Sequence, residues 1–156
     1  MEKIASDSPL TDEQAETLKT LTGLMIPASE TFGVPGADDA QIFGEILVAA
    51  RNHAAVVSEA LTALAQAAAT DLAKPFTEVT SAEGQEIVNR VQASHPRWVA
   101  VLVSITVECY YRDARVMASL EMPTRAPFPD GYDVPQGDWS LLDPVRERGP
   151  IWRRTS

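Results

Sequence analysis

The chain has 156 residues, of which 45% are hydrophobic, and its formal net charge at pH 7 is −9. This length suits one domain whose core buries about two thirds of the surface of the unfolded chain. The acidic balance argues against nucleic acid and anionic membrane surfaces as partners, because both are bound through clustered Lys and Arg.

The cysteine content and the lengths of the apolar runs indicate in which cellular compartment to expect the chain. Cys109 is the only cysteine, so no intrachain disulfide can form and one chain cannot complete a cysteine-based metal site. The first nine residues hold no basic segment followed by an apolar run, so we expect no export signal. The longest largely apolar run, Trp98 to Val107, is much shorter than the ~20 residues of a membrane span. We therefore expect no membrane span and a cytoplasmic location, or a periplasmic one if a leader was removed or the partner is exported.

The first half of the chain carries clear helix signals. Thr11 and Gln14 have the spacing of a capping box that opens a first helix, and Pro27 ends it. From Asp38 to Ala73 an apolar stripe continues, with ten alanines between residues 49 and 69. This pattern predicts either one long helix or two helices separated near Arg51–His53.

Further helices are predicted up to residue 120. Thr80 with Glu83 forms a second capping box, and Pro96 suits the first turn of the next helix. The run 98–107 is rich in β-branched residues, but it shows no polar alternation and a lone strand would leave backbone groups unpaired. We interpret it as a buried helix continuing to about Tyr111, after which Asp113 caps a short helix. Residues 1–120 are therefore predicted to form an all-α, compact bundle of about five helices.

Composition changes after Leu120. Residues 121–156 hold six of the eleven prolines, two of the three tryptophans and five arginines, and no helical or alternating stripe extends across them. Prolines at this spacing favour extended or turning backbone, so we predict a long extended C-terminal arm. Because Trp, Tyr and Arg carry much of the energy of protein interfaces, the arm is predicted to bind a partner protein. Packing against its own bundle is the alternative.

The sequence shows no catalytic, cofactor-binding or metal-binding constellation. His53 and His95 stand in no metal-ligand spacing, and a Gly-rich phosphate loop is absent. We interpret His53 as a helix-surface or interhelix residue and His95 as a cap or loop residue. Cys109 follows Glu108, whose charge raises a thiol pKa, so we expect a buried and unreactive thiol. The chain is predicted to hold no cofactor or metal of its own and to carry no catalysis.

Three groups of residues resemble the gluconate 2-dehydrogenase subunit 3 family. They are Leu24–Pro27 with Pro35–Ala37, then Tyr110–Asp113 with Val116 and Leu120, and finally Pro127–Tyr132 with Asp138–Arg146 and Arg148–Arg153. The resemblance spans nearly the whole chain, and the arm carries its most specific motifs. Glu121 stands where we expect a glycine in this pattern, which predicts a changed turn into the arm.

The resemblance implies a small non-catalytic subunit of an oxidoreductase complex. Its partner would be a flavin-dependent large subunit of the glucose–methanol–choline type, which oxidises sugars or other alcohols and which this chain stabilises, matures or helps to export. FAD is then expected in the partner, within a hetero-oligomer. The alternatives are a general adaptor or self-associating protein with an arm-mediated interface, and a stand-alone helical enzyme.

The predicted partner-binding residues combine the tyrosine pair with the aromatic, apolar and basic residues of the arm. They are Tyr110, Tyr111, Arg125, Phe128, Tyr132, Trp139, Leu141, Leu142, Arg146, Arg148, Trp152 and Arg153.

Overall fold

The computed structural model describes residues 10–124, 131 and 135–149. Within these residues the regular structure is helical, apart from one isolated antiparallel bridge between Ser29 and Val34. The all-α fold class predicted from the sequence is therefore confirmed. The chain divides into two units, residues 1–124 and residues 125–156, which are described separately.

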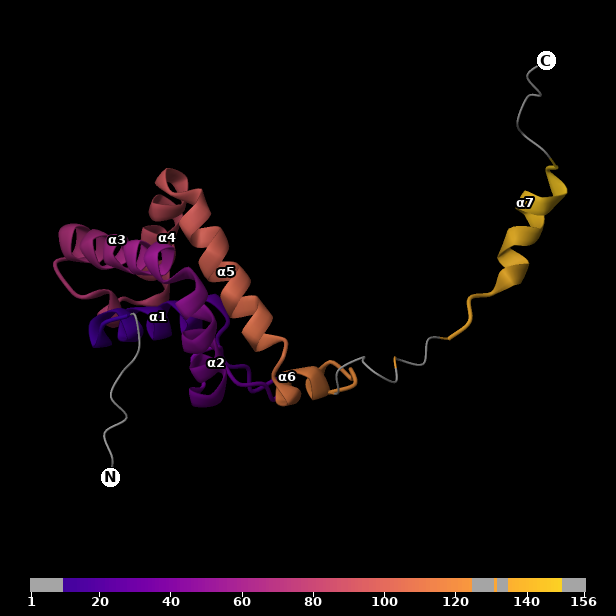
Figure 1. Cartoon of the computed structure of the whole chain (residues 1–156), viewed down its shortest axis with the longest axis horizontal. Helices are drawn as coiled ribbons and strands as arrows, with labels where there is room; N and C mark the ends of the chain where they lie inside the picture. Colours follow the sequence, from indigo (N-terminus) through magenta and orange to yellow (C-terminus); the bar gives the residue numbers. More distant parts are fainter. Residues whose placement is uncertain (1–9, 125–130, 132–134, 150–156) are drawn as a thin grey trace, which may run out of the picture. The chain divides into compact units, whose positions relative to one another are not determined.

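The N-terminal unit contains six α-helices and two 3-10 turns among its described residues (Figure 1). In chain order they are α1 (Asp12–Met25), α2 (Ala40–Ala50), η1 (Arg51–His53), α3 (Ala54–Leu72), η2 (Phe76–Glu78), α4 (Ser81–Ser94), α5 (Pro96–Tyr110) and α6 (Ala114–Ser119). The unit has six helices rather than about five because η1 divides the long alanine-rich segment. Of the two alternatives for that segment, two helices separated at residues 51–53 is the one observed.

Both predicted capping boxes are present. At α1, the Gln14 N–H donates to the Thr11 hydroxyl and the Gln14 side chain accepts from the Thr11 N–H, each at 3.1 Å. At α4, the Glu83 carboxylate accepts from the Thr80 N–H and from Lys74, each at 2.7 Å. The bond from Lys74, with those from Thr80, lowers the pKa of Glu83 to about 2. These local contacts fix where two of the helices begin.

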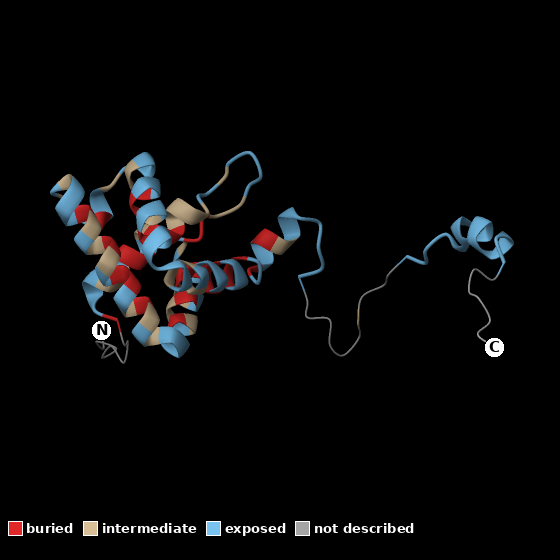
Figure 2. Cartoon of the chain, turned by 90° about the horizontal axis from the view of Figure 1, so that it is seen from above, coloured by how far each residue is buried: buried red, intermediate tan, exposed pale blue. Residues whose placement is uncertain are grey.

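Helix α5 is at the centre of the packing, because it contacts α2, α3 and α4. Leu102, Ile105 and Cys109 form its buried side and join one apolar cluster with residues of the other helices. Figure 2 shows the buried residues on the inward sides of the helices of this unit. The prediction that α5 is a helix is confirmed, but it is not buried all round: Val103 and Val107 are 41% and 38% exposed.

The C-terminal unit contains a short helical segment among its described residues. The 3-10 turn η3 (Trp139–Leu142) leads directly into α7 (Asp143–Glu147). The prediction of extended backbone is therefore wrong over residues 139–147. Pro144 lies in the first turn of α7, where a missing N–H breaks no helical bond, so this proline is compatible with a helix.

Two residues with side chains adopt the left-handed backbone conformation at helix ends. Ala73 follows α3 with φ of 52°, and Glu121 follows α6 with φ of 56°. After α6, the N–H groups of Met122 and Glu121 donate to the carbonyls of Met117 and Ala118, which is a Schellman motif. Glu121 thus keeps the conformation that the expected glycine would favour.

We predict that Ala73→Gly and Glu121→Gly each stabilise the N-terminal unit. Glycine removes the steric cost of a positive φ, and we expect a gain of about 0.5–1 kcal/mol after its greater loss of chain entropy. Thermal unfolding of the full chain measures the effect. The control Ala69→Gly lies inside α3 and should lower stability by about 1 kcal/mol. Equal losses for Ala73→Gly and Ala69→Gly would contradict the account.

Candidate partner-binding surface

Helix α5 presents an uncovered apolar stripe. Val103, Val107 and Tyr111 follow one another at four-residue intervals, and Tyr111 directly follows the last residue of the helix. This spacing places them on one side of the helix. Tyr111 is 49% exposed, and the two valines are the partly exposed residues noted above. Apolar side chains along one helix face, open to solvent, are typical of an interaction surface.

A shallow groove continues this stripe at the C-terminal end of α5. Its lining residues are Phe32, Val34, Tyr110, Tyr111, Val116, Ser119 and Leu120, and its volume is about 210 Å³. Tyr111 belongs to both the stripe and the groove, which are therefore continuous. We call the exposed apolar residues of this surface, Phe32, Val103, Val107, Tyr111 and Leu120, the docking face.

The loop between α1 and α2 supplies Phe32 to this surface. Ser29 and Val34 exchange two backbone hydrogen bonds of 3.0 and 3.1 Å, which close a tight turn around residues 30–33. Gly33 has a φ of 63°, a value that glycine adopts without strain. Phe32, at 75% exposure, is one of the most exposed large apolar side chains of the described residues. The turn therefore displays the ring instead of burying it.

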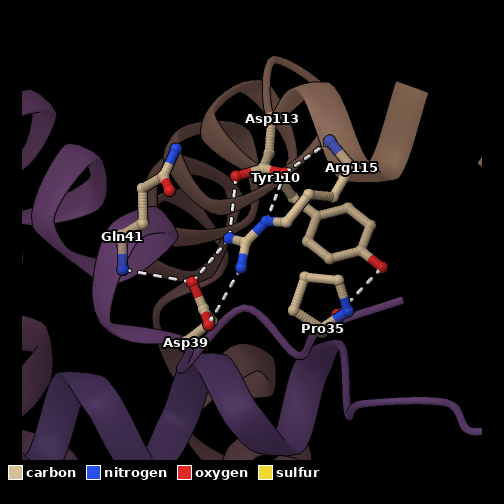
Figure 3. Close-up of polar contacts among 6 residues, drawn as sticks. All are labelled: Pro35, Asp39, Gln41, Tyr110, Asp113 and Arg115. Carbon is tan, nitrogen blue, oxygen red and sulfur yellow. Dashed lines mark hydrogen bonds and ion pairs between the residues drawn. The ribbon is translucent and has the colours of Figure 1, made fainter. Parts of the chain in front are cut away.

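The two adjacent tyrosines have different roles. Tyr110 is 5% exposed, and its hydroxyl donates a 3.2 Å hydrogen bond to the carbonyl of Pro35 (Figure 3). Burial raises the pKa of Tyr110, and Tyr111 and Asp113 add to this shift. The rings of Tyr110 and Tyr111 meet edge to face with centroids 5.3 Å apart. Tyr110 therefore supports the surface from within and Tyr111 is the exposed member of the pair, while contact of either tyrosine with a partner stays a prediction.

Arg115 joins the N-terminal ends of two helices (Figure 3). Asp39 caps α2 by accepting from the Gln41 N–H, and Asp113 caps α6 by accepting from the Arg115 N–H. The Arg115 guanidinium donates to Asp39 at 2.6 Å and to Asp113 at 2.9 Å. Its Nε–H also donates to Asp113, at 3.0 Å. We call this group of three charged residues the Arg115 clamp.

The clamp is partly buried, and its three charged groups shift one another's pKa values. Asp113 is only 7% exposed, so its ionised carboxylate is stable there only with a hydrogen-bonded or oppositely charged partner. Hydrogen bonds from Arg115 are the main reason that the pKa values of Asp113 and Asp39 are both lowered, and the two carboxylates in turn raise the pKa of Arg115. These three side chains fix α6, which carries Leu120 at its C-terminal end, against the start of α2.

The predicted partner-binding residues of the arm fall into two groups. Those that the structure describes are exposed: Trp139, Leu141, Leu142, Arg146 and Arg148. The others lie outside the described residues: Arg125, Phe128, Tyr132, Trp152 and Arg153. The predicted set did not include Phe32, Val103, Val107 and Leu120, which the structure adds to the candidate surface. The four-residue spacing of Val103, Val107 and Tyr111 was a usable signal once α5 was assigned as a helix.

Cys109, His95 and His53 lie outside the clamp, each in a different environment. Burial is the main cause that raises the pKa of the Cys109 thiol, with Glu45 and Glu108 adding to it. Cys109 lines a cavity of about 250 Å³ with Gln41, Glu45 and Arg112. His95 stacks on Trp98 with ring centroids 3.8 Å apart, and His53 is exposed.

Among the residues that the structure describes, no three potential metal-ligating side chains lie together. None of the helices in this described part is both long and apolar enough to cross a membrane.

The fold and the docking face define a small helical protein with a surface suited to binding another protein. Residues 12–122 match the family model described as gluconate 2-dehydrogenase subunit 3, and the chain belongs to that family. The predicted family is thus confirmed, and it is named for a subunit of a dehydrogenase complex. No curated protein and no solved structure matches the chain significantly.

The matched residues extend from the start of α1 to just beyond α6. They end before most of the arm, which was predicted to carry the most specific motifs of the family. The helical body therefore carries the family match.

We predict that Arg115→Met lowers the free energy of unfolding at pH 7 by more than substitution of an exposed arginine does, because it leaves the buried Asp113 carboxylate without its main charged partner. Both clamp carboxyls have lowered pKa values in the folded protein. Their contribution is therefore present above the ordinary value of 3.8 and is lost as the pH falls through the folded values. Urea unfolding at several pH values should show the difference from the unsubstituted protein shrinking below about pH 4.

The control for this measurement is Arg97→Met, at an exposed arginine in the first turn of α5. We expect a change within about 0.5 kcal/mol there. A loss at Arg115→Met that is no larger than the control, or that does not change with pH, would show that the clamp contributes little.

Proposed function

We propose that this chain is a non-catalytic subunit that binds and stabilises, or matures, a flavin-dependent catalytic subunit oxidising sugars or other alcohols. The observation that carries the proposal is the docking face, on a chain whose family is named for a dehydrogenase subunit. Exposed contiguous apolar surface is costly in water and commonly marks a site of protein association.

The composition of the docking face suits a stable interface. Phe32 and Tyr111 supply aromatic rings, and aromatic anchors with surrounding aliphatic contacts carry most of the energy of such interfaces. The surface is also held in shape before binding. Tyr110 anchors the loop that carries Phe32, and the Arg115 clamp anchors α6. Such preorganisation lowers the entropy cost of association.

The charged groups of this body support a structural role. Asp39, Asp113 and Arg115 are engaged with one another, and burial raises the pKa of Cys109 away from the reactive thiolate form. In line with the family resemblance, we propose that catalysis and FAD reside in the partner, a large subunit of the glucose–methanol–choline type, within a hetero-oligomer. We place the complex in the cytoplasm, or in the periplasm if the partner is exported.

We predict that the tagged full chain co-purifies with a yellow flavoprotein and is itself colourless when purified alone. Val107→Asp should weaken this complex by about 2 kcal/mol or more, roughly thirtyfold in Kd, because it places a charge within an apolar interface. Titration of the purified flavoprotein with each variant measures the Kd.

Val48→Asp is a matched control. Val48 is a 59% exposed valine on α2 that belongs neither to the stripe nor to the groove, and its substitution should change the Kd less than threefold. The proposed function is wrong if no flavoprotein co-purifies. The docking face is wrongly assigned if the two aspartate variants bind equally well.

A further inference from the structure

We propose that residues 138–147 are a second, independent docking point: an amphipathic helical segment that binds in an apolar groove of the same flavin-dependent partner. This inference rests on the proposed function. It assigns to η3 and α7 a role separate from that of the docking face.

The segment gathers its apolar side chains on one side and leaves all of them uncovered. Trp139 and Leu142 are three residues apart, and Leu141 and Val145 are four apart, which are the intervals of one helix face. Their exposed fractions are 63%, 41%, 74% and 58% respectively. Figure 2 shows the whole of this helical segment in the colour of exposed residues. An apolar helix face of this kind matches the helix-in-groove mode of recognition.

Local contacts favour the helical form of the segment. The Asp138 carboxylate accepts from the Ser140 N–H at 3.0 Å and from the Ser140 hydroxyl at 2.6 Å, and these bonds lower the pKa of Asp138. Asp143 and Arg146 form an ion pair of 3.0 Å one helical turn apart. A helix this short is marginal in water even when capped, so its apolar face needs a surface to pack on.

The charge distribution indicates which surface this is. Residues 125–156 hold five arginines and five acidic residues, so residues 1–124 carry the entire net charge of −9. Two such acidic bodies repel each other, which disfavours a second copy of this chain as the binding partner. The arm has no net charge, so charge repulsion does not oppose its binding to another protein. The segment also lies beyond the family-matched residues 12–122, so it adds a contact to the one that the matched body offers.

If two docking points are linked in one chain, the loss of one should change mainly the dissociation rate of the complex. Fifteen residues separate Met122 from Asp138 in the chain. A tether of this length keeps the second segment at about millimolar effective concentration once the first has bound, and it raises affinity by about 10²–10⁴-fold. Loss of the helical segment should therefore act mainly on the dissociation rate, while the docking face still allows a weaker complex to form.

The test measures dissociation of full-length variants from the purified flavoprotein by surface plasmon resonance. Leu142→Lys should raise the dissociation rate about a hundredfold. Gln136→Lys introduces the same charge at an exposed residue just before the segment and should raise the rate less than threefold. Equal rates for the two lysine variants would overturn the inference, and the proposed function would still stand if Val107→Asp weakens binding.

A crosslinking measurement identifies the surface directly. Because Cys109 is buried, Leu142→Cys provides a cysteine that a benzophenone maleimide can label selectively in the full chain. Irradiation of the purified complex should attach this position to the flavoprotein, and mass spectrometry should place the attachment among apolar residues. A product with a second copy, a product with this chain's own residues 10–124, or no product would each overturn the inference.

Discussion

Helix α5 is apolar over most of its circumference, with Ser104 and Glu108 among its few polar residues, and apolar sides of a helix are stabilised when other elements cover them. The body has three helices available to pack around it: α2, α3 and α4. They cover the side with Leu102, Ile105 and Cys109 but leave the arc with Val103 and Val107 exposed. The docking face is therefore a consequence of the packing: the core has one helix side more than its own helices can cover, and that side remains available for another molecule.

The remaining parts of the docking face are attached to α5 by polar contacts. The loop with Phe32 is closed on itself by the Ser29–Val34 bridge and tied to α5 through the hydrogen bond from Tyr110 to Pro35. Helix α6 is tied to the start of α2 by Arg115. These polar groups lie beside the apolar surface, so they shape it without placing charge on it. The loop between α1 and α2 is thus joined to α5 and α6, which follow one another in the sequence, in one surface that contacts within the chain hold in shape.

Much of the helical body follows from local signals in the sequence. Capping boxes need only residues three apart, which is why Thr11 and Thr80 predicted two helix starts correctly. The Arg115 clamp was beyond such reasoning, because Arg115 and Asp39 are 76 positions apart and neither residue signals the other. The spacing of Val103, Val107 and Tyr111 groups them on one side of α5, but the sequence alone does not tell whether a neighbouring helix covers that side. In the arm, the spacing of the prolines predicts extended or turning backbone, yet Pro144 occupies the first turn of α7, a position that suits proline.

The separation of charge between the two units bears on how a partner is selected. Since the body carries the full net charge of −9, electrostatic repulsion at low ionic strength disfavours contact between two copies and favours a partner surface that is not acidic. The five side chains that define the docking face are uncharged, so affinity there depends on shape and apolar area. Such a surface alone discriminates weakly between partners, because one apolar patch resembles another. A second binding segment on the neutral arm raises discrimination without enlarging the apolar patch, since only a protein with both surfaces at the right separation gains the combined affinity.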